Sequence, residues 1–216
     1  MAKPGSKPGS GTTGSGAAET RAALIRGAIG ALSDTGYAGA SAREIARRAG
    51  CNQALIFYHF GSVDGVLLAA LDEVSAERLT KYQAAVQGSG TMSELVKTAR
   101  SVFDEDLDRG YVAVLAAMIA GAQSSPALGA EVAARLGPWR EFAAESLQPF
   151  LGSTPLAGMI RGEEIAHAIV ALYLGLEMLA SLDGDRAAAL ALFDRARRAA
   201  SLLDMLGAGS RQEGSL

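Results

Sequence analysis

The chain has 216 residues, 49% of them apolar and 20% charged, which is enough for one or two domains with a substantial core. Its formal net charge of −3, from 20 basic and 23 acidic side chains, argues at first against a nucleic-acid-binding protein. A single cysteine, Cys51, excludes a disulfide framework, and with only two histidines, His59 and His167, we expect no metal site and no cofactor.

The charge is distributed unevenly along the chain. Residues 1–60 carry seven basic and three acidic side chains, a net charge of +4, whereas residues 61–216 carry 13 basic and 20 acidic side chains, a net charge of −7. Such asymmetry is more informative than the total charge. It indicates a basic, anion-binding N-terminal module on an acidic body.

The sequence predicts neither a signal peptide nor a membrane-spanning segment. The first 16 residues lack an apolar core and are rich in Gly, Ser, Pro, Thr and Lys, which predicts a disordered tail rather than a signal peptide. The apolar run Val112–Ala122 is too short to span a bilayer, and Ile165–Leu182 contains His167 and Glu177, which are costly in lipid. We therefore predict two buried helices and a soluble, cytoplasmic protein.

The N-terminal quarter is predicted to contain three short or medium helices and the start of a fourth. The first covers about Ala17–Thr35 and ends at Gly36 in a left-handed conformation. The second begins with a reciprocal capping box between Ser41 and Glu44 and ends at Gly50. After a turn, the third helix covers about Gln53–Phe60, and Ser62 caps a fourth that reaches about Gln87.

The rest of the chain is also predicted to be helical, so the fold class is all-α. The expected helices are Met92–Arg109, Tyr111–Gln123, Ala127–Phe150 (with a kink at Gly137-Pro138), Gly162–Leu182 and Asp185–Leu206. We expect a disordered tail at 1–16, a helix-turn-helix domain at 17–62, a helical effector-binding and dimerisation domain at 63–206, and a flexible C-terminus at 207–216.

The second and third predicted helices carry the functional signal. Two short helices that meet at a turn containing Gly50 are typical of a helix-turn-helix, although a plain corner between two helices gives the same pattern. The third helix presents Gln53, Tyr58 and His59 and no acidic residue, and glutamine can bind adenine in a bidentate manner. Basic side chains that could neutralise phosphates lie on the second helix: Arg43, Arg47 and Arg48.

These residues also carry a family resemblance. Residues 20–71 resemble the N-terminal domain of the TetR family of transcriptional regulators, and the match covers about a quarter of the chain. The matching elements are Gly36-Tyr37, Ser41 with Glu44-Ile45-Ala46, Ala49-Gly50-Cys51-Asn52, Ile56-Phe57-Tyr58-His59-Phe60 and Val66-Leu67. The resemblance implies a dimeric regulator that binds DNA through this domain and a small molecule through the rest of the chain.

The resemblance also implies roles for single residues. The expected DNA-binding set is Ser41, Ala42, Arg43, Gln53, Ala54, Leu55, Tyr58 and His59. Within it, Ser41 and Ala42 would touch phosphate and Gln53 and Ala54 would face base edges. Tyr58 and His59 would approach the DNA backbone, although His59 could equally pack against the end of the helix.

Three positions depart from the family pattern. Leu55 replaces a common Thr or Ser, Phe57 replaces a common Tyr, and Val63 replaces a common Lys, so three phosphate contacts are lost. We hypothesise that the tail, with Lys3 and Lys7, compensates by lying along the duplex. We interpret Ile56, Phe57 and Phe60 as core residues, and Cys51 as a small buried or turn residue rather than a redox sensor.

The C-terminal body is predicted to serve dimerisation and ligand binding. The last two helices are apolar on more than one face, which predicts a two-fold interface, although both could instead form the core of a monomer. The candidate interface residues are Ile169, Leu172, Leu176, Leu190, Phe193 and Leu203. The candidate effector-binding residues, which could also be plain core, are Phe103, Met118, Gln123, Trp139, Phe142, His167, Tyr173 and Glu177.

The sequence thus predicts a TetR-like, ligand-responsive repressor that binds a palindromic operator on double-stranded DNA as a homodimer. Its effector is expected to be largely hydrophobic. No phosphate-binding glycine loop, nucleophile elbow or HExxH motif is present in the sequence, so we do not expect an enzyme. The alternative is a helical module that binds a ligand or a protein and does not bind DNA.

Overall fold

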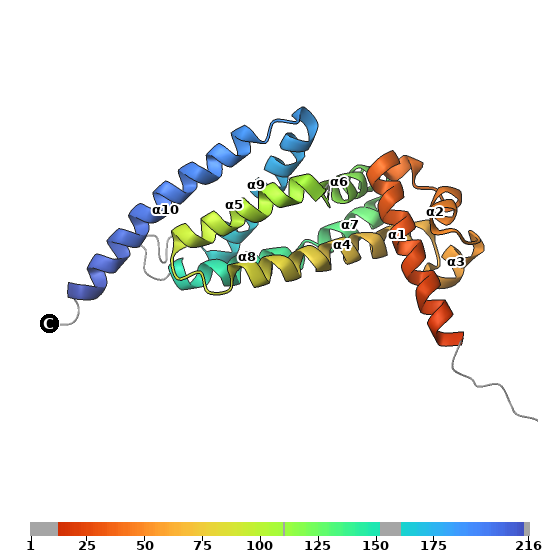
Figure 1. Ribbon diagram of the computed structural model, residues 1–216, viewed down its shortest axis with the longest axis horizontal. Coiled ribbons are helices and arrows are strands. Elements are labelled where there is room, and N and C mark those ends of the chain that lie inside the picture. Colours follow the sequence, from red (N-terminus) through yellow and green to blue (C-terminus); the bar gives the residue numbers. More distant parts are fainter. Residues whose placement is uncertain (1–12, 110, 152–160, 214–216) are drawn as a thin grey trace, which may run out of the picture.

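The computed structural model describes residues 13–109, 111–151 and 161–213, and every regular element among them is an α-helix, as predicted. The molecule is elongated (Figure 1). The three N-terminal helices lie at one end and the C-terminal part of the last helix lies at the other. The other helices form the body between these two ends.

The N-terminal unit contains α1 (Thr13–Gly39), α2 (Ala42–Ala49) and α3 (Ala54–Phe60). Gly36 has a φ of 66° and kinks α1, so the predicted end of this helix is confirmed, with a short helical continuation to Gly39. The helix starts at Thr13 rather than at Ala17, so residues 13–16 of the predicted tail are helical. Residues 1–12 lie outside the described part of the chain.

The capping box of α2 is half formed. The Ser41 hydroxyl accepts a hydrogen bond from the Glu44 amide at 3.3 Å, as predicted. The reciprocal bond is absent, because the Ser41 amide donates to the Gly39 carbonyl and the Glu44 carboxylate binds Arg47 and Arg48. Charge-assisted bonds from two guanidinium groups are stronger than a bond from one backbone amide. Gly50 ends the helix in a left-handed conformation, as predicted.

The remaining helices follow the predicted order with one difference. They are α4 (Val63–Val86), α5 (Met92–Arg109), α6 (Tyr111–Ala122), α7 (Pro126–Ala134), α8 (Gly137–Leu151), α9 (Gly162–Asp183) and α10 (Ala187–Glu213). The single helix predicted at Ala127–Phe150 is therefore two helices, which separate at Arg135 and Leu136. Pro138 lacks a backbone N–H and is accommodated best in the first turn of a helix, and here it lies at the start of a new helix instead of kinking a long one.

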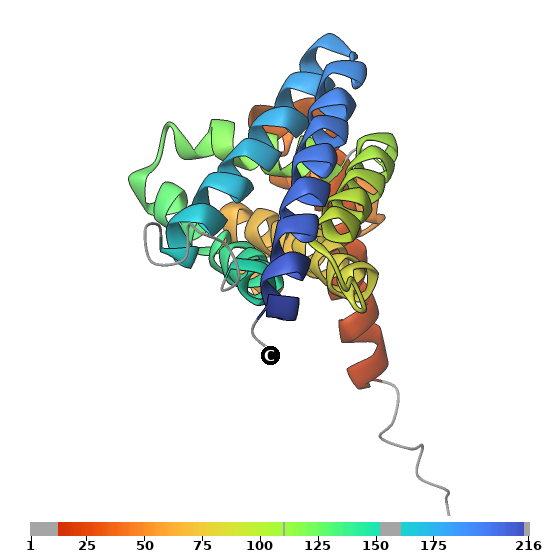
Figure 2. The same cartoon turned by 90° about the vertical axis from the view of Figure 1, so that its left-hand side faces the viewer.

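The last helix continues beyond its predicted end. Helix α10 runs to Glu213, whereas the sequence predicts a flexible segment after Leu206. In Figure 2, α10 lies beside α5. Two acidic side chains help to hold this pair together. Asp104 of α5 accepts a hydrogen bond at 3.0 Å from Arg186, which directly precedes α10, and Asp204 of α10 accepts from the backbone amides of Met92 and Ser93 at the start of α5.

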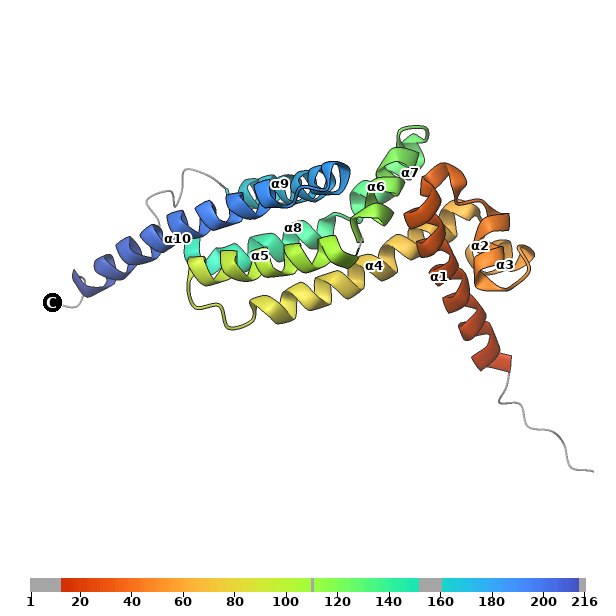
Figure 3. The same ribbon diagram turned by 45° about the horizontal axis from the view of Figure 1, so that its top comes forward.

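One hydrophobic core runs from the N-terminal unit into the body. It joins Leu24 of α1, Ile45 of α2, Ile56 of α3 and Leu67 of α4, and continues to Met118 of α6. Helix α4 starts in this core and then runs along the body (Figure 3). Because α4 is shared, the packing is continuous across position 62, where the sequence predicts a domain boundary.

The two apolar runs differ in burial. Helix α6 is buried at Val112, Val114, Ala117 and Met118, as predicted. Helix α9 is long and apolar enough to span a membrane, with a mean hydropathy of 1.8, yet only 17% of that stretch is buried, which corrects the prediction of a buried helix. Its Glu177 is fully buried and pairs with Arg78, so one side of α9 is anchored in the body while the other side is uncovered.

Candidate functional site

Helix α3 presents an outward face at the tip of the molecule. Ile56 is fully buried against the core, whereas Tyr58 is 80% exposed and Phe57 is 52% exposed. Gln53 and Ala54, one helical turn before these two aromatic residues, are also exposed. The four side chains Gln53, Ala54, Phe57 and Tyr58 therefore form one continuous outer surface.

The start of α3 is organised by Asn52. The Asn52 side-chain oxygen accepts a hydrogen bond from the Ala54 amide at 2.8 Å, and its backbone carbonyl accepts from the Leu55 amide at 3.0 Å. The helix consequently begins at Ala54, and Gln53 occupies the turn just before it. The Gln53 side chain forms no hydrogen bond among the described residues and is free to meet another molecule.

Two predicted DNA-binding residues lie partly inside. Leu55 is half-buried and packs against the core. His59 is also half-buried, with its ring edge-on to Tyr58 at 4.9 Å and to Phe60 at 6.2 Å. Cys51 is half-buried in the turn.

The interpretation of Phe57 as a core residue is wrong. Ile56 and Phe60, four residues apart, already fill the inward face of this short helix, so Phe57, which follows Ile56 directly, points outward. Phe57 thus joins the exposed surface, which sequence reasoning missed. The signal was present in the helical period, because Phe57 and Gln53 share one face.

The three arginines of α2 have different partners. Arg48 is held between Glu44 and Asp34, with nitrogen–oxygen distances of 2.6 Å to each. Arg47 also binds Glu44, and its guanidinium, followed by that of Arg48, lowers the pKa of the Glu44 carboxyl to about 2. Arg43 is exposed and forms no ion pair within the described part of the chain. Of the three side chains predicted to neutralise phosphates, Arg43 is the most available.

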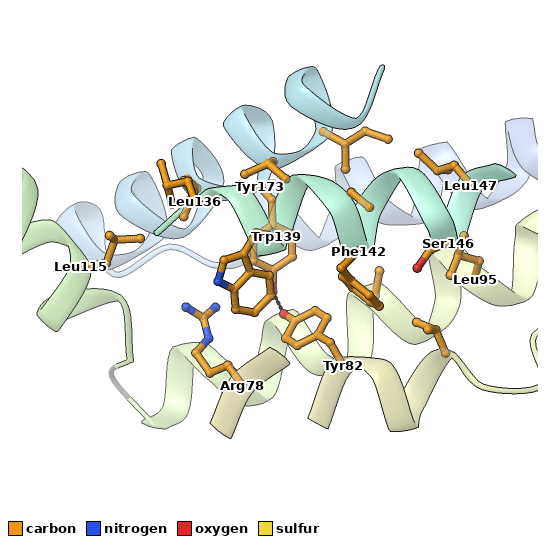
Figure 4. A pocket seen from close by; sticks show the side chains of 16 residues that line it. Arg78, Tyr82, Leu95, Leu115, Leu136, Trp139, Phe142, Ser146, Leu147 and Tyr173 are labelled. Atoms are coloured by element: carbon orange, nitrogen blue, oxygen red, sulfur yellow. Dashed lines mark hydrogen bonds between the residues drawn. The ribbon is translucent and has the colours of Figure 1, made fainter. Parts of the chain in front are cut away.

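The body contains a cavity of about 140 Å³ (Figure 4). Most of its lining is apolar or aromatic and comes from α4, α5, α8 and α9. The lining residues are Arg78, Tyr82, Val86, Leu95, Ala99, Leu115, Leu136, Trp139, Phe142, Ala143, Ser146, Leu147, Ile169, Val170, Tyr173 and Leu174. The predicted effector residues Trp139, Phe142 and Tyr173 are therefore brought together at this cavity.

A buried ion cluster supports one end of the cavity. Arg78 donates through Nε and Nη2 to Asp106 Oδ2 at 3.0 and 2.9 Å, and through Nη2 to Glu177 Oε1 at 2.6 Å. The Tyr82 hydroxyl donates to the same Asp106 oxygen at 3.0 Å and contacts the hydroxyl of Tyr173. The Arg78 guanidinium also lies 5.4 Å from the centre of the Trp139 ring.

The cluster holds two carboxyl groups and one guanidinium. Burial raises the pKa of Glu177 to about 7, although Arg78 acts in the opposite direction. Burial also raises the pKa of Tyr82 and of Tyr173, so both phenols stay protonated. When Asp106 and Glu177 are both ionised, the cluster carries one net negative charge in an interior environment.

The other predicted effector residues do not line this cavity. Phe103 is fully buried and packs on Tyr173, with 5.1 Å between ring centres. Met118 belongs to the core that joins the body to the N-terminal unit, and Gln123 and His167 are exposed. Glu177 does not line the cavity but accepts a hydrogen bond from Arg78, which does. Sequence reasoning missed Arg78 and Tyr82, whose spacing of four residues on α4 was the available signal.

Comparison with known proteins agrees with this geometry. Residues 24–70, which contain most of α1, all of α2 and α3 and the start of α4, match the family described as bacterial regulatory proteins, tetR family. This segment of the chain is therefore similar to the N-terminal domain of the TetR family. A search of curated proteins finds no match.

Solved structures of transcriptional regulators share the fold over most of the chain. A Rhodococcus sp. protein described as a TetR-family transcriptional regulator is 20% identical, with a TM-score of 0.70 over 84% of this chain and 98% of its own. A TetR-family member from Streptomyces coelicolor A3 is 26% identical, with a TM-score of 0.61 over 82% and 98%. The regulator FadR from Bacillus subtilis, solved with stearoyl-CoA, is 15% identical, with a TM-score of 0.69 over 85% and 97%.

The last two helices, α9 and α10, leave a large apolar surface uncovered. Its exposed members are Ile169, Leu172, Leu179, Leu182, Leu192, Leu202, Leu203 and Met205. Of the predicted interface residues, Leu172 is 60% exposed and Leu203 is 41% exposed, whereas Leu176, Leu190 and Phe193 are half-buried within the chain. Ile169 is exposed and also lines the cavity.

Proposed function

We propose that this chain is a TetR-family, ligand-responsive transcriptional repressor that binds a palindromic operator as a homodimer in the cytoplasm. The observation that carries the proposal is the exposed face of α3 in a helix-turn-helix at the tip of the molecule. A surface that holds an unpaired glutamine and two outward aromatic rings, and no acidic side chain, suits a DNA groove.

The DNA contacts follow from the exposure of each side chain. Gln53 and Ala54 would meet base edges in the major groove, and Phe57 would add apolar contact with a thymine methyl group. Ser41, Ala42 and Arg43, at the start of α2, would bind phosphates together with Tyr58 and the edge of His59. Leu55 is turned partly inward, so its role is to seat α3 on the core rather than to contact DNA.

The uncovered apolar surface of α9 and α10 supports the dimer. An isolated chain would leave Leu172, Leu179 and Leu182 in water, which is unfavourable for a contiguous apolar patch. A second copy related by a two-fold axis buries the same residues on both chains. That symmetry also matches two recognition helices to the two halves of a palindrome.

The cavity supports ligand control. It lies against α4, whose first turns pack in the helix-turn-helix core, so a ligand that favours one position of α4 changes the position of α3. A ligand shifts such an equilibrium only by its difference in affinity for the two states. Release of DNA on ligand binding would lift a steric block at a promoter.

A gel shift on the upstream region of the gene at two salt concentrations tests the DNA-binding proposal. We expect specific binding that weakens as salt increases, because counterions are released from phosphates. Absence of binding at low salt would favour the alternative, a helical module that binds a ligand or a protein without DNA.

A further inference from the structure

Most polar groups around the cavity already have partners. The Tyr82 hydroxyl donates to Asp106, the Tyr173 hydroxyl contacts that of Tyr82, and Trp139 Nε1 donates to Ser75 Oγ at 2.8 Å. Arg78 uses only Nε and Nη2 in its bonds to the two carboxylates. Its Nη1 forms no hydrogen bond among the described residues, and the guanidinium borders the cavity beside Trp139 (Figure 4).

The carboxylates bound to Arg78 determine which ligand group its free Nη1 can bind. Asp106 and Glu177 already exceed the single positive charge of Arg78, and Lys81 next to Asp106 is balanced by Glu105. A ligand carboxylate at Nη1 would add a third negative charge to a buried site. A ligand cation would face the guanidinium directly. A neutral hydrogen-bond acceptor meets neither penalty.

The size and lining of the cavity restrict the rest of the ligand. Its volume of about 140 Å³ is close to that of an apolar cavity that holds one benzene molecule, about 150 Å³. Aromatic side chains of Trp139, Phe142 and Tyr82 border it, and Ser146 supplies a hydroxyl that can donate or accept. An aromatic ring or a short branched chain fits this space.

We propose that the cavity selects a neutral, mostly apolar ligand with a carbonyl or ether oxygen that accepts a hydrogen bond from Arg78 Nη1, and that it rejects a carboxylate of the same shape. This inference rests on the proposed role of the cavity as the effector site. The effector is then not only hydrophobic but also neutral, with its hydrogen-bond acceptor located at Arg78 Nη1.

Four small molecules with the same branched phenyl skeleton test the proposal: acetophenone, benzoate, benzamidinium and isopropylbenzene. They present a neutral acceptor, an anion, a cation and a methyl group at the same position. Binding to the full-length wild-type protein without DNA is measured by calorimetry or by ligand-observed NMR. We expect acetophenone to bind most tightly and benzoate and benzamidinium most weakly. Tightest binding of benzoate or benzamidinium, equal binding of acetophenone and isopropylbenzene, or binding of none would overturn the proposal.

The Glu177→Gln variant isolates the charge effect. It removes one negative charge and keeps a hydrogen-bond acceptor for Arg78, so benzoate should gain about tenfold in affinity relative to acetophenone, the equivalent of one pKa unit of interaction. Glu163→Gln, at an exposed position of the same helix, is the matched control and should leave the ratio unchanged. An unchanged ratio in folded Glu177→Gln protein would contradict the proposal.

A titration of the wild-type protein gives the same information if Glu177→Gln does not fold. The groups that face Glu177 are Arg78 and Tyr82 of α4, Asp106 of α5 and Tyr173 of α9. Protonation of Glu177 as the pH falls from about 8 to about 6 should reduce the discrimination against benzoate. Constant discrimination would overturn the proposal. Because no step uses DNA, failure here leaves the DNA-binding proposal intact, and failure of the gel shift leaves these affinities interpretable.

Discussion

The ring of Tyr37 lies so close to Gly121 that a Cβ atom at that glycine would overlap the ring. The hydroxyl of Tyr37 also donates a hydrogen bond to Asp64 Oδ1 at 2.7 Å, and this bond raises the pKa of the phenol to about 12. One side chain at the end of α1 thus contacts both the start of α4 and the end of α6. The helix-turn-helix unit is joined to the body at this point.

The Gly121→Ala substitution should therefore destabilise the protein. The added methyl group must displace the Tyr37 ring, and overpacking of this kind costs about 1–3 kcal/mol. The free energy of unfolding, measured by denaturant titration, checks this. Gly129→Ala is the control, because its Cβ would lie 3.7 Å from the nearest atom, the Ala122 carbonyl oxygen, and should be neutral or slightly stabilising. Equal stability of the two variants would contradict the tight packing of Tyr37 against Gly121.

Two arginines on α2 should behave oppositely. Arg43→Ala should weaken binding to all DNA sequences and reduce the salt slope by about 1, with unchanged thermal stability, because Arg43 has no partner within the described protein. Arg48→Ala should lower thermal stability, because it releases Asp34 and Glu44. Affinity at several salt concentrations and a melting curve for each variant separate the two roles. If Arg43→Ala lost stability and Arg48→Ala did not, the assignment of Arg43 to DNA contact and of Arg48 to structural support would be wrong.

Sequence preference should depend on Gln53. Its exposed, unbonded amide lies just before α3, so Gln53→Ala should weaken operator binding by about 1–3 kcal/mol. Binding to scrambled DNA of the same length should not change, because non-specific affinity comes from phosphate contacts. Competition gel shifts measure both values. An equal loss on both duplexes would show that Gln53 contacts the backbone.

Glu177 should make stability depend on pH. Its pKa is about 7 in the folded chain, against an ordinary value of 4.5, so the folded state binds the proton more tightly than the unfolded state. The stabilisation of the folded state by this tighter proton binding is fully present below about pH 4.5 and is lost as the pH rises to about 7. As the pH rises between these two values, the free energy of unfolding of Glu177→Gln should therefore increase relative to that of the wild type. Parallel denaturation curves at several pH values give the difference, and a difference that does not vary with pH would contradict the burial effect.

A charge on the uncovered face of α9 should break the dimer. Leu172 is 60% exposed in the single chain, so Leu172→Glu would bury two carboxylates in a two-fold interface. We expect the mass in solution to fall from that of a dimer to that of one chain, 22.1 kDa. Ala130→Glu adds the same charge at an exposed position of α7 and should leave the dimer intact. Light scattering measures both, and a monomeric wild type would remove the basis of the prediction.

Local signals in the sequence predict much of the fold. Gly36, Gly50 and Gly61 all adopt positive φ at helix ends, and Ser41 and Ser62 cap the helices that follow them. The helical period places Ile56 inside and Phe57 outside, whereas the apolar character of Phe57 by itself favours a core position. At this position the helical spacing, and not the residue type, indicates the exposed side.

The cavity was less predictable because its parts are distant in sequence. Arg78 and Glu177 are separated by 99 positions, and nothing local in either segment indicates that they pair. Met118, Gln123 and His167 have suitable chemistry, but tertiary packing directs the first into another core and the other two into solvent. Such a site depends on which faces of four helices meet, which a single sequence does not specify.

Helix α4 connects the two ends of the proposed mechanism. Leu67 lies in the helix-turn-helix core and Tyr82 lies at the cavity, and at 1.5 Å per residue they are about 22 Å apart on one continuous rod. Coupling through such a rod is reciprocal, because linkage requires that each ligand change the affinity for the other by the same factor. Operator DNA would therefore act as an antagonist of the small molecule, and the free dimer would capture the effector more tightly than the dimer already seated on its promoter.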